Sequence, residues 1–145
     1  MSSGGHRVDT RGAMSDENVE IVRRVYEAAP TRREVLRELY ALDYRFDLTQ
    51  AAPDLGVVRG FDAAFDALAA YWEMFESFHD ELEEVIHADE EQVVTAVRDC
   101  GRMRGSESEV WNRFFHVFTF RDGKIARVSA QLDRNRALEA AGLSE

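Results

Sequence analysis

The sequence is poor in cysteine and lysine, and it has no long hydrophobic run. Cys100 is its only cysteine, so no disulfide can form within the chain and nothing favours an oxidising compartment. The apolar segments are far too short to span a bilayer. No charged segment followed by an apolar one marks a secretory signal at the N-terminus. We therefore expect a cytoplasmic protein that does not enter a membrane.

Basic residues are also scarce relative to acidic ones, 18 against 28, which gives a formal net charge of −10. Nucleic acids and acidic membrane surfaces bind proteins through clustered cations, so we expect neither as a partner. A chain of 145 residues, 45% of them hydrophobic, is enough for one domain with its own core. Residues 1–14 are small and polar without periodicity, and we expect a disordered leader or cloning remnant there, followed by a single domain over 15–145.

Three segments in the first half show the helical spacing of apolar residues. The first begins at Ser15, a candidate N-cap, and ends before Pro30. The second begins with a T-x-x-E capping box formed by Thr31 and Glu34. The third carries a bulky apolar stripe. Its members are Phe61, Phe65, Leu68, Trp72 and Phe75.

Strand spacing appears at 43–48 and again in four runs that begin near Phe78. Turn-rich segments separate the four runs at hairpin spacing, which predicts an antiparallel meander. A short closing helix follows, with Asp133 as its N-cap and Gly142 as its C-cap. This order predicts an α+β fold whose helices cover one face of a curved sheet. The hollow between them would form a closed pocket of roughly 300–1,000 Å³ for a small ligand.

Four segments are similar to a known family. They are "ENVEIVRRVYEA" in the first helix, "GVVRGFDAAF" before the third, "FHVFTFRDGKI" at the last hairpin and "LDRNRALEAAGL" at the end. From Ser15 to Leu143 the chain resembles a SnoaL-like domain of the NTF2-like superfamily. The resemblance implies a cone-shaped fold, a curved antiparallel sheet covered by three N-terminal helices. The superfamily includes polyketide cyclases, ketosteroid isomerases, dehydratases and epoxide hydrolases, and also non-catalytic transport and association domains, so the fold leaves the activity open.

The sequence departs from two catalytic patterns of this superfamily. Cyclase-like and isomerase-like relatives often carry a carboxylate five residues past the isoleucine of D-G-K-I, where this chain has Ala130. Epoxide hydrolases of the fold use an Asp-Arg-Asp arrangement with two members on one strand face. Arg98 and Asp99 are adjacent and point to opposite faces. Both departures weaken the case for catalysis.

His116 is the first catalytic candidate. Phe114 and Phe118 flank it at strand spacing, so we expect a buried histidine that acts as an acid or base near pH 7, or a core residue satisfied by one hydrogen bond. The register of the last hairpin decides what lies beside it. A two-residue type I′ turn places His116 opposite Ser129, on the face of Gln131, and makes the pocket floor polar.

The other register gives a nearly dry floor. A type I turn with a bulge at Gly123 places His116 opposite Val128, beside Ala126 and Ala130. The residues alone do not choose between the two turns.

Asp47 is the second catalytic candidate, although its parity on the strand also fits a solvent-facing carboxylate. Arg98 shares the parity of apolar neighbours, so it requires a buried carboxylate or an anionic ligand as partner. Further candidates for ligand binding are aromatic residues, for which core packing is the alternative, and one amide. They are Tyr26, Tyr44, Trp72, Phe114, Phe118 and Gln131. No metal-binding spacing and no cofactor motif is present, so we expect neither metal nor cofactor.

Two functional hypotheses follow. In the first, the protein binds a small apolar molecule, of polyketide or steroid type, with cofactor-free acid–base catalysis of the isomerase, cyclase or hydrolase type left open. In the second, it is a non-catalytic dimerisation or assembly module that uses the outer sheet face, with Phe115, Val117 and Trp111. Because a soluble monomer rarely exposes such a patch, we expect a homodimer under either hypothesis.

Overall fold

The computed structural model describes residues 3–143, with side chains from Met14 onward, and has the expected α+β class. In chain order the elements are α1 (Ser3–Ala28), α2 (Arg33–Arg37), β1 (Tyr40–Asp47), β2 (Val57–Arg59), α3 (Phe61–Trp72), β3 (Phe75–Ala88), β4 (Gln92–Met103), β5 (Glu109–Arg121), β6 (Lys124–Gln131) and α4 (Arg134–Ala140). Strands β3 to β6 form the predicted antiparallel meander.

The six strands form one curved sheet in the order β2-β1-β6-β5-β4-β3. The sheet is mixed rather than antiparallel throughout, because β1 and β6 run parallel. The chain leaves β1, passes through α3 and three meander strands, and returns beside β1 in the same direction. Strand β2 pairs with β1 and lies outside the segments whose spacing predicted strands.

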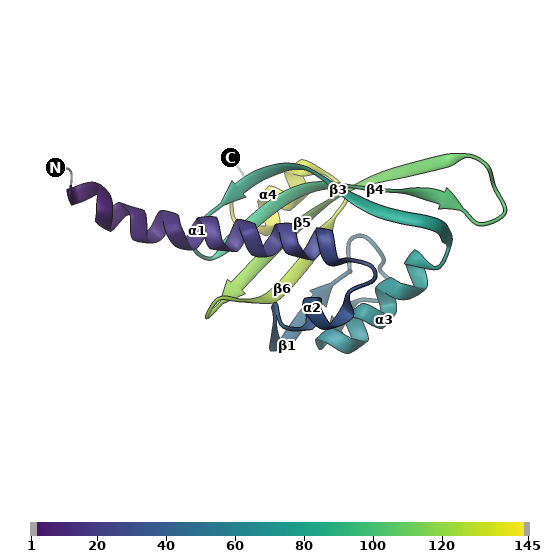
Figure 1. The fold of residues 1–145 in the computed structure, drawn as a ribbon, viewed down its shortest axis with the longest axis horizontal. Coiled ribbons are helices and arrows are strands. Elements are labelled where there is room, and N and C mark those ends of the chain that lie inside the picture. Colours follow the sequence, from purple (N-terminus) through teal and green to yellow (C-terminus); the bar gives the residue numbers. More distant parts are fainter. Residues whose placement is uncertain (1–2, 144–145) are drawn as a thin grey trace.

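Helices α1, α2 and α3 lie on one face of the sheet, and α4 lies on the other (Figure 1). The main core fills the space between the first three helices and the sheet. On β1 the predicted alternation is confirmed, since Tyr44, Phe46 and Leu48 are buried within this core. The three N-terminal helices of the prediction are therefore present, with α3 following the first two strands.

The helix starts differ from the prediction at two places. Helix α1 runs through Ser15, the expected N-cap, and begins at Ser3. Helix α2 starts at Arg33 without a side-chain cap, so the capping box does not form. Glu34 pairs instead with Arg37 on the surface. The division into a leader, 1–14, and a domain, 15–145, stays a prediction.

The β5–β6 hairpin has a register that differs from both alternatives. Asp122 and Gly123 both have positive φ, +54° and +79°, as a type I′ turn requires. A bulge just beyond the turn then shifts the pairing by one residue, so that His116 lies opposite Ala130. Ser129 consequently faces the side of the sheet that α4 covers.

The outer face is less exposed than the sequence suggested. Phe115 and Val117 are buried there and pack with Ala137 of α4. Trp111 alone of the predicted patch is exposed, with 52% of its surface accessible. The closing helix covers the apolar patch on which the expectation of self-association depended.

Candidate functional site

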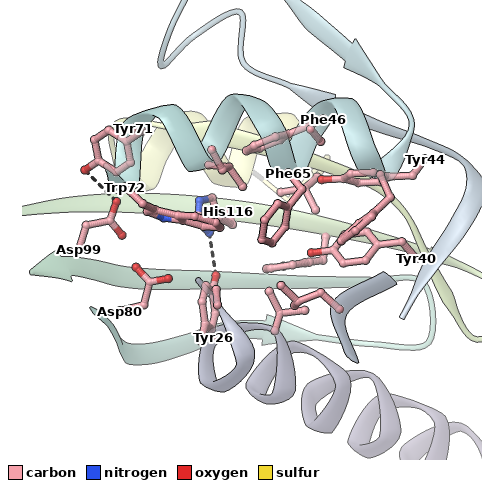
Figure 2. A pocket seen from close by; sticks show the side chains of 18 of the residues that line it. Tyr26, Tyr40, Tyr44, Phe46, Phe65, Tyr71, Trp72, Asp80, Asp99 and His116 are labelled. Atoms are coloured by element: carbon pink, nitrogen blue, oxygen red, sulfur yellow. Dashed lines mark hydrogen bonds between the residues drawn. The ribbon is translucent and has the colours of Figure 1, made fainter. Parts of the chain in front are cut away.

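The helices and the sheet enclose a cavity of about 90 Å³. It is smaller than expected because bulky rings from β1 and α3 occupy most of the hollow. These rings belong to Tyr40, Tyr44, Phe46, Phe61, Phe65 and Trp72 (Figure 2). An apolar cavity of about 150 Å³ holds benzene, so even a ligand of one ring requires side chains of the wall to move.

Two carboxyl groups lie at one end of this cavity. Asp80 on β3 and Asp99 on β4 are directly opposite each other in the antiparallel register. Their side chains lie next to each other in Figure 2, and the Tyr71 hydroxyl donates a hydrogen bond of 3.2 Å to Asp99 Oδ2. Asp80 Oδ1 is buried and has no hydrogen-bond partner within the described part of the chain.

The carboxyl group of Asp80 keeps its proton at neutral pH. Burial raises the pKa of Asp80 to about 9, aided by its hydrogen bond to Asp99 and by the negative charge of Asp99. Two neighbouring carboxyl groups in a buried site do not both ionise readily. The pair therefore combines one exchangeable proton with one negative charge, which is the equipment of a general acid–base group.

His116 lies on the same sheet face, half-buried in the cavity wall. Its Nδ1 is 2.7 Å from the Tyr26 hydroxyl, which also lies 2.8 Å from Thr95 Oγ1 (Figure 2). Burial lowers the pKa of His116 to about 4, so the imidazole is neutral near pH 7. The three side chains form a hydrogen-bonded row across α1, β4 and β5.

The structure brings together five of the predicted site residues in the cavity wall: Tyr26, Tyr44, Trp72, His116 and Phe118. It leaves Asp47, Arg98, Phe114 and Gln131 outside the wall. Asp47 accepts hydrogen bonds from Thr49 and pairs with Arg127.

Arg98 points to the outer face, as the parity argument for adjacent residues requires. There it pairs with Glu81 at 2.6 Å and lies over the Trp111 ring. Gln131 donates to Ser129 Oγ on the α4 side of the sheet, because the bulge in β6 changes which residues face the cavity.

The sequence reasoning missed Asp80, Asp99 and Tyr71. The acidic segment around Asp80 reads as a solvated edge, but this residue has the strand parity of Phe78 and Leu82. A carboxylate at an apolar position of the strand alternation could have indicated that Asp80 points inward. On β4 the residues of both faces are apolar, because α4 covers the second face of the sheet. The alternation of apolar residues therefore could not show whether Arg98 or Asp99 points into the cavity.

One group of potential metal ligands lies on the outer face. Ligand atoms of His79, Glu81 and Cys100 lie within 4.8 Å of one another. Glu81 is already hydrogen-bonded to His79 at 3.0 Å and ion-paired with Arg98. The trio therefore offers no free carboxylate, and we assign no metal to it.

A comparison of sequences decides the family. The sequence model of the SnoaL-like domain matches residues 22–128. The chain belongs to the SnoaL-like domain family. No curated protein matches the SnoaL-like chain in a sequence search. Within the described residues, no helix is long and apolar enough to cross a membrane.

Solved structures share the SnoaL-like fold at low sequence identity. One is a protein from Jannaschia sp. CCS1 described as a SnoaL-like polyketide cyclase, with a TM-score of 0.69, 24% identity and coverage of 90% of this chain and 92% of that one. TerC, co-crystallised with polyporic acid, has a TM-score of 0.68 and 18% identity over 88% and 97% of the two chains.

A third is a protein from Catenulispora acidiphila DSM 44928 with a ketosteroid isomerase-like fold, in complex with trimethylamine. It has a TM-score of 0.65 and 20% identity over 86% of this chain and 93% of that one.

Proposed function

We propose that this SnoaL-like protein binds a small, flat, mainly apolar molecule in the cavity and moves a proton on it with the Asp80–Asp99 pair. The observation that carries the proposal is a carboxyl pair at the end of an aromatic cavity, with Asp80 Oδ1 unpartnered among the described residues. Buried polar groups in folded proteins are almost always hydrogen-bonded. An acceptor left open toward a cavity is therefore best explained by a ligand that satisfies it.

The fold relatives support the binding half of the proposal. TerC was crystallised with polyporic acid, and the Catenulispora acidiphila protein with trimethylamine. Small molecules thus occupy proteins of this fold, although neither ligand transfers to this chain by identity alone. The small volume of the present cavity favours a compact ligand.

Asp80 and Asp99 supply the chemistry without a cofactor. The ionised member of the pair can take a proton from a bound molecule while the protonated member can return one elsewhere on it, and the buried setting keeps the charge poorly solvated. Reaction of the isomerase type, in which a proton leaves one atom and arrives at another, fits this pair best. We assign His116 and Tyr26 the role of positioning groups in the wall, because the imidazole stays neutral around pH 7.

A screen of one- and two-ring compounds by thermal shift tests the binding half. We expect hits that raise the Tm of the wild type and shift Asp80→Asn and Asp99→Asn much less. The matched control is Glu81→Gln, which changes the neighbouring carboxylate on the outer face of the same strand. Shifts of equal size in all four proteins would exclude the pair from the binding site.

Hydrogen–deuterium exchange tests the catalytic half. For a bound compound with a C–H bond next to a carbonyl, NMR should reveal protein-dependent exchange at that carbon. Replacing Asp80 by asparagine should slow it by at least about 100-fold, the usual contribution of a positioned acid or base. Exchange that proceeds equally fast in the variant would contradict proton transfer by the Asp80–Asp99 pair, and only the binding role would remain.

A second candidate function is self-association through the outer face, and we propose a homodimer built on the β4–β5 hairpin. Trp111 is exposed there, and the guanidinium carbons of Arg98 and Arg113 lie 5.3 and 5.2 Å from its ring centroid. Tryptophan and arginine are enriched at the centres of protein interfaces. Sedimentation should give a dimer for the wild type and a monomer for Trp111→Ser; a wild-type monomer at micromolar concentration would contradict the proposal.

A further inference from the structure

The free oxygen of the carboxyl pair determines what kind of group a ligand must bring. Asp80 hydrogen-bonds to Asp99, and Tyr71 directs its hydroxyl hydrogen to Asp99 and not to Asp80. Among the described residues no donor reaches Asp80 Oδ1, which is buried and open to a donor from a ligand. A carbonyl oxygen cannot satisfy an acceptor. The ligand must present an N–H or O–H donor at this position.

Charge distinguishes between these two donors. Among the described residues that line the cavity there is no lysine and no arginine, and the remaining basic group, His116, is neutral. Arg98 is adjacent to Asp99 in sequence but pairs with Glu81 on the outer face. The negative charge of the carboxyl pair is therefore not compensated by a cation of the wall. In a weakly solvated cavity, a positively charged donor is attracted much more strongly than a neutral one.

The rings next to the pair also favour a cation. The ring centroids of Tyr71 and Phe78 lie 5.8 Å apart, and those of Trp72 and Phe78 lie 5.9 Å apart. All three residues line the cavity, and Tyr71 and Trp72 lie near Asp99 in Figure 2. Aromatic faces attract ammonium groups, and the effect grows when the site excludes water. The same rings provide an apolar surface for the body of the ligand.

We propose that the cavity selects small apolar molecules that carry a protonated amine, with the ammonium group donating to Asp80 Oδ1 beside both carboxyl groups. This inference rests on the proposed function, because it names the ligand class of the same cavity. An ammonium group satisfies the open acceptor and compensates the negative charge. A neutral alcohol satisfies only the acceptor, and a carbonyl compound needs a separate N–H or O–H group to satisfy it. The cavity volume favours a small apolar body, and a single ring fits once side chains of the wall move.

Benzylamine and benzyl alcohol form a matched probe pair, since they differ mainly in the charge of the donor. Calorimetry near neutral pH should give at least about tenfold tighter binding of benzylamine, a difference of about 1.4 kcal/mol. Measured in two buffers of different ionisation enthalpy, amine binding should release a proton, because the cation promotes ionisation of the second carboxyl group. Asp80→Asn should lose most of the tenfold preference, and Glu81→Gln should retain it.

The outcomes separate this inference from the proposed function. Equal affinity for the amine and the alcohol would overturn the ammonium class while leaving a binding cavity. An amine preference that survives in both Asp80→Asn and Asp99→Asn would assign the cation to another place and overturn the inference. Failure of both probes to bind up to about 10 mM would also overturn it, whereas the compound screen would still decide the proposed function.

Discussion

Carboxyl groups on the two faces of strands β3 and β4 have pKa values that are shifted in opposite directions. On the outer face Glu81 and Glu83 lie beside Arg98 and Arg113, and hydrogen bonds from these arginines lower the pKa of both glutamates. On the inner face, one residue away along the chain, burial raises the pKa of Asp80 to about 9. Exposure to solvent and a cationic partner therefore determine whether a carboxyl group is ionised. The position of a residue on the strand determines which face, and so which of these environments, its carboxyl group occupies.

The two sets of carboxyl groups also differ in the role that their chemistry allows. The outer carboxylates are paired, exposed and charged, so their interactions contribute little to stability. The inner pair keeps a proton, a negative charge and an open acceptor next to aromatic rings. A cavity with unsatisfied polar groups costs folding stability, and proteins retain such groups mainly at functional sites.

The largest effect on stability is expected for Tyr26→Phe on the inner face. The lost hydroxyl leaves the buried Thr95 and the half-buried His116 without the partner that both now contact. The free energy of unfolding should fall by about 2–4 kcal/mol, since each unpaired buried group costs roughly 1–3 kcal/mol. Tyr44→Phe in the same cavity is the control, and urea titration of both variants measures the difference. Equal loss in the two variants would contradict the hydrogen-bonded row.

A smaller effect of opposite sign is expected for Asp80→Asn. Between the ordinary carboxyl pKa of 3.8 and about 9 the folded wild type binds more protons than the unfolded chain, so its stability falls as pH rises through this window. The groups that face Asp80 are Asp99, Tyr71 and the neutral His116, and burial keeps Tyr71 uncharged by raising its pKa. An asparagine at position 80 does not titrate, so this dependence of stability on pH is lost in the variant.

The variant should therefore be more stable than the wild type, and its advantage should grow by about 1–3 kcal/mol from pH 5 to pH 8. Thermal unfolding across this pH range measures the gap. Glu83→Gln on the outer face should give no such slope, because its lowered pKa places the titration below pH 5. Parallel curves for the wild type and Asp80→Asn would mean that Asp80 is ionised in the folded protein.

The smallest effect is expected on the outer face, for Arg98→Ala. Its ion pair with Glu81 is exposed to solvent and screened by salt. The Tm should stay within about 2 °C of the wild type, and any ligand of the cavity should bind unchanged. A strong loss of ligand binding in this variant would mean that Arg98 belongs to the binding site, which would contradict the difference between the two faces.

Periodicity in the sequence was enough to predict the α+β class, the meander and the closing helix, because each depends on local spacing of apolar residues. It did not predict β2 or the parallel pairing of β1 with β6, which arise from contacts between distant segments. The bulge in β6 was equally hidden, and it removed Ser129 and Gln131 from the side of His116. One extra residue in a strand changes every inward side chain beyond it.

The aromatic wall was more predictable than the polar end of the cavity. Tyr26, Tyr44 and Trp72 follow the periodicity of buried residues, so the sequence indicated their position. The carboxyl pair depends on which residues of β3 and β4 lie opposite each other, and that register passes through bulges in β3. Because Glu81, Glu83 and Glu84 follow Asp80, the segment resembles an acidic surface strand, and the sequence did not indicate that Asp80 points inward.

The central claim, a proton held by Asp80 beside Asp99 inside the cavity, is tested most directly by carbon-13 NMR of the aspartate carboxyl groups across the pH range. The account predicts that the Asp80 carboxyl titrates far above its ordinary range, at about pH 9, and that this resonance is missing in Asp80→Asn. A carboxyl carbon of Asp80 that titrates near its ordinary value of 3.8 would contradict the account.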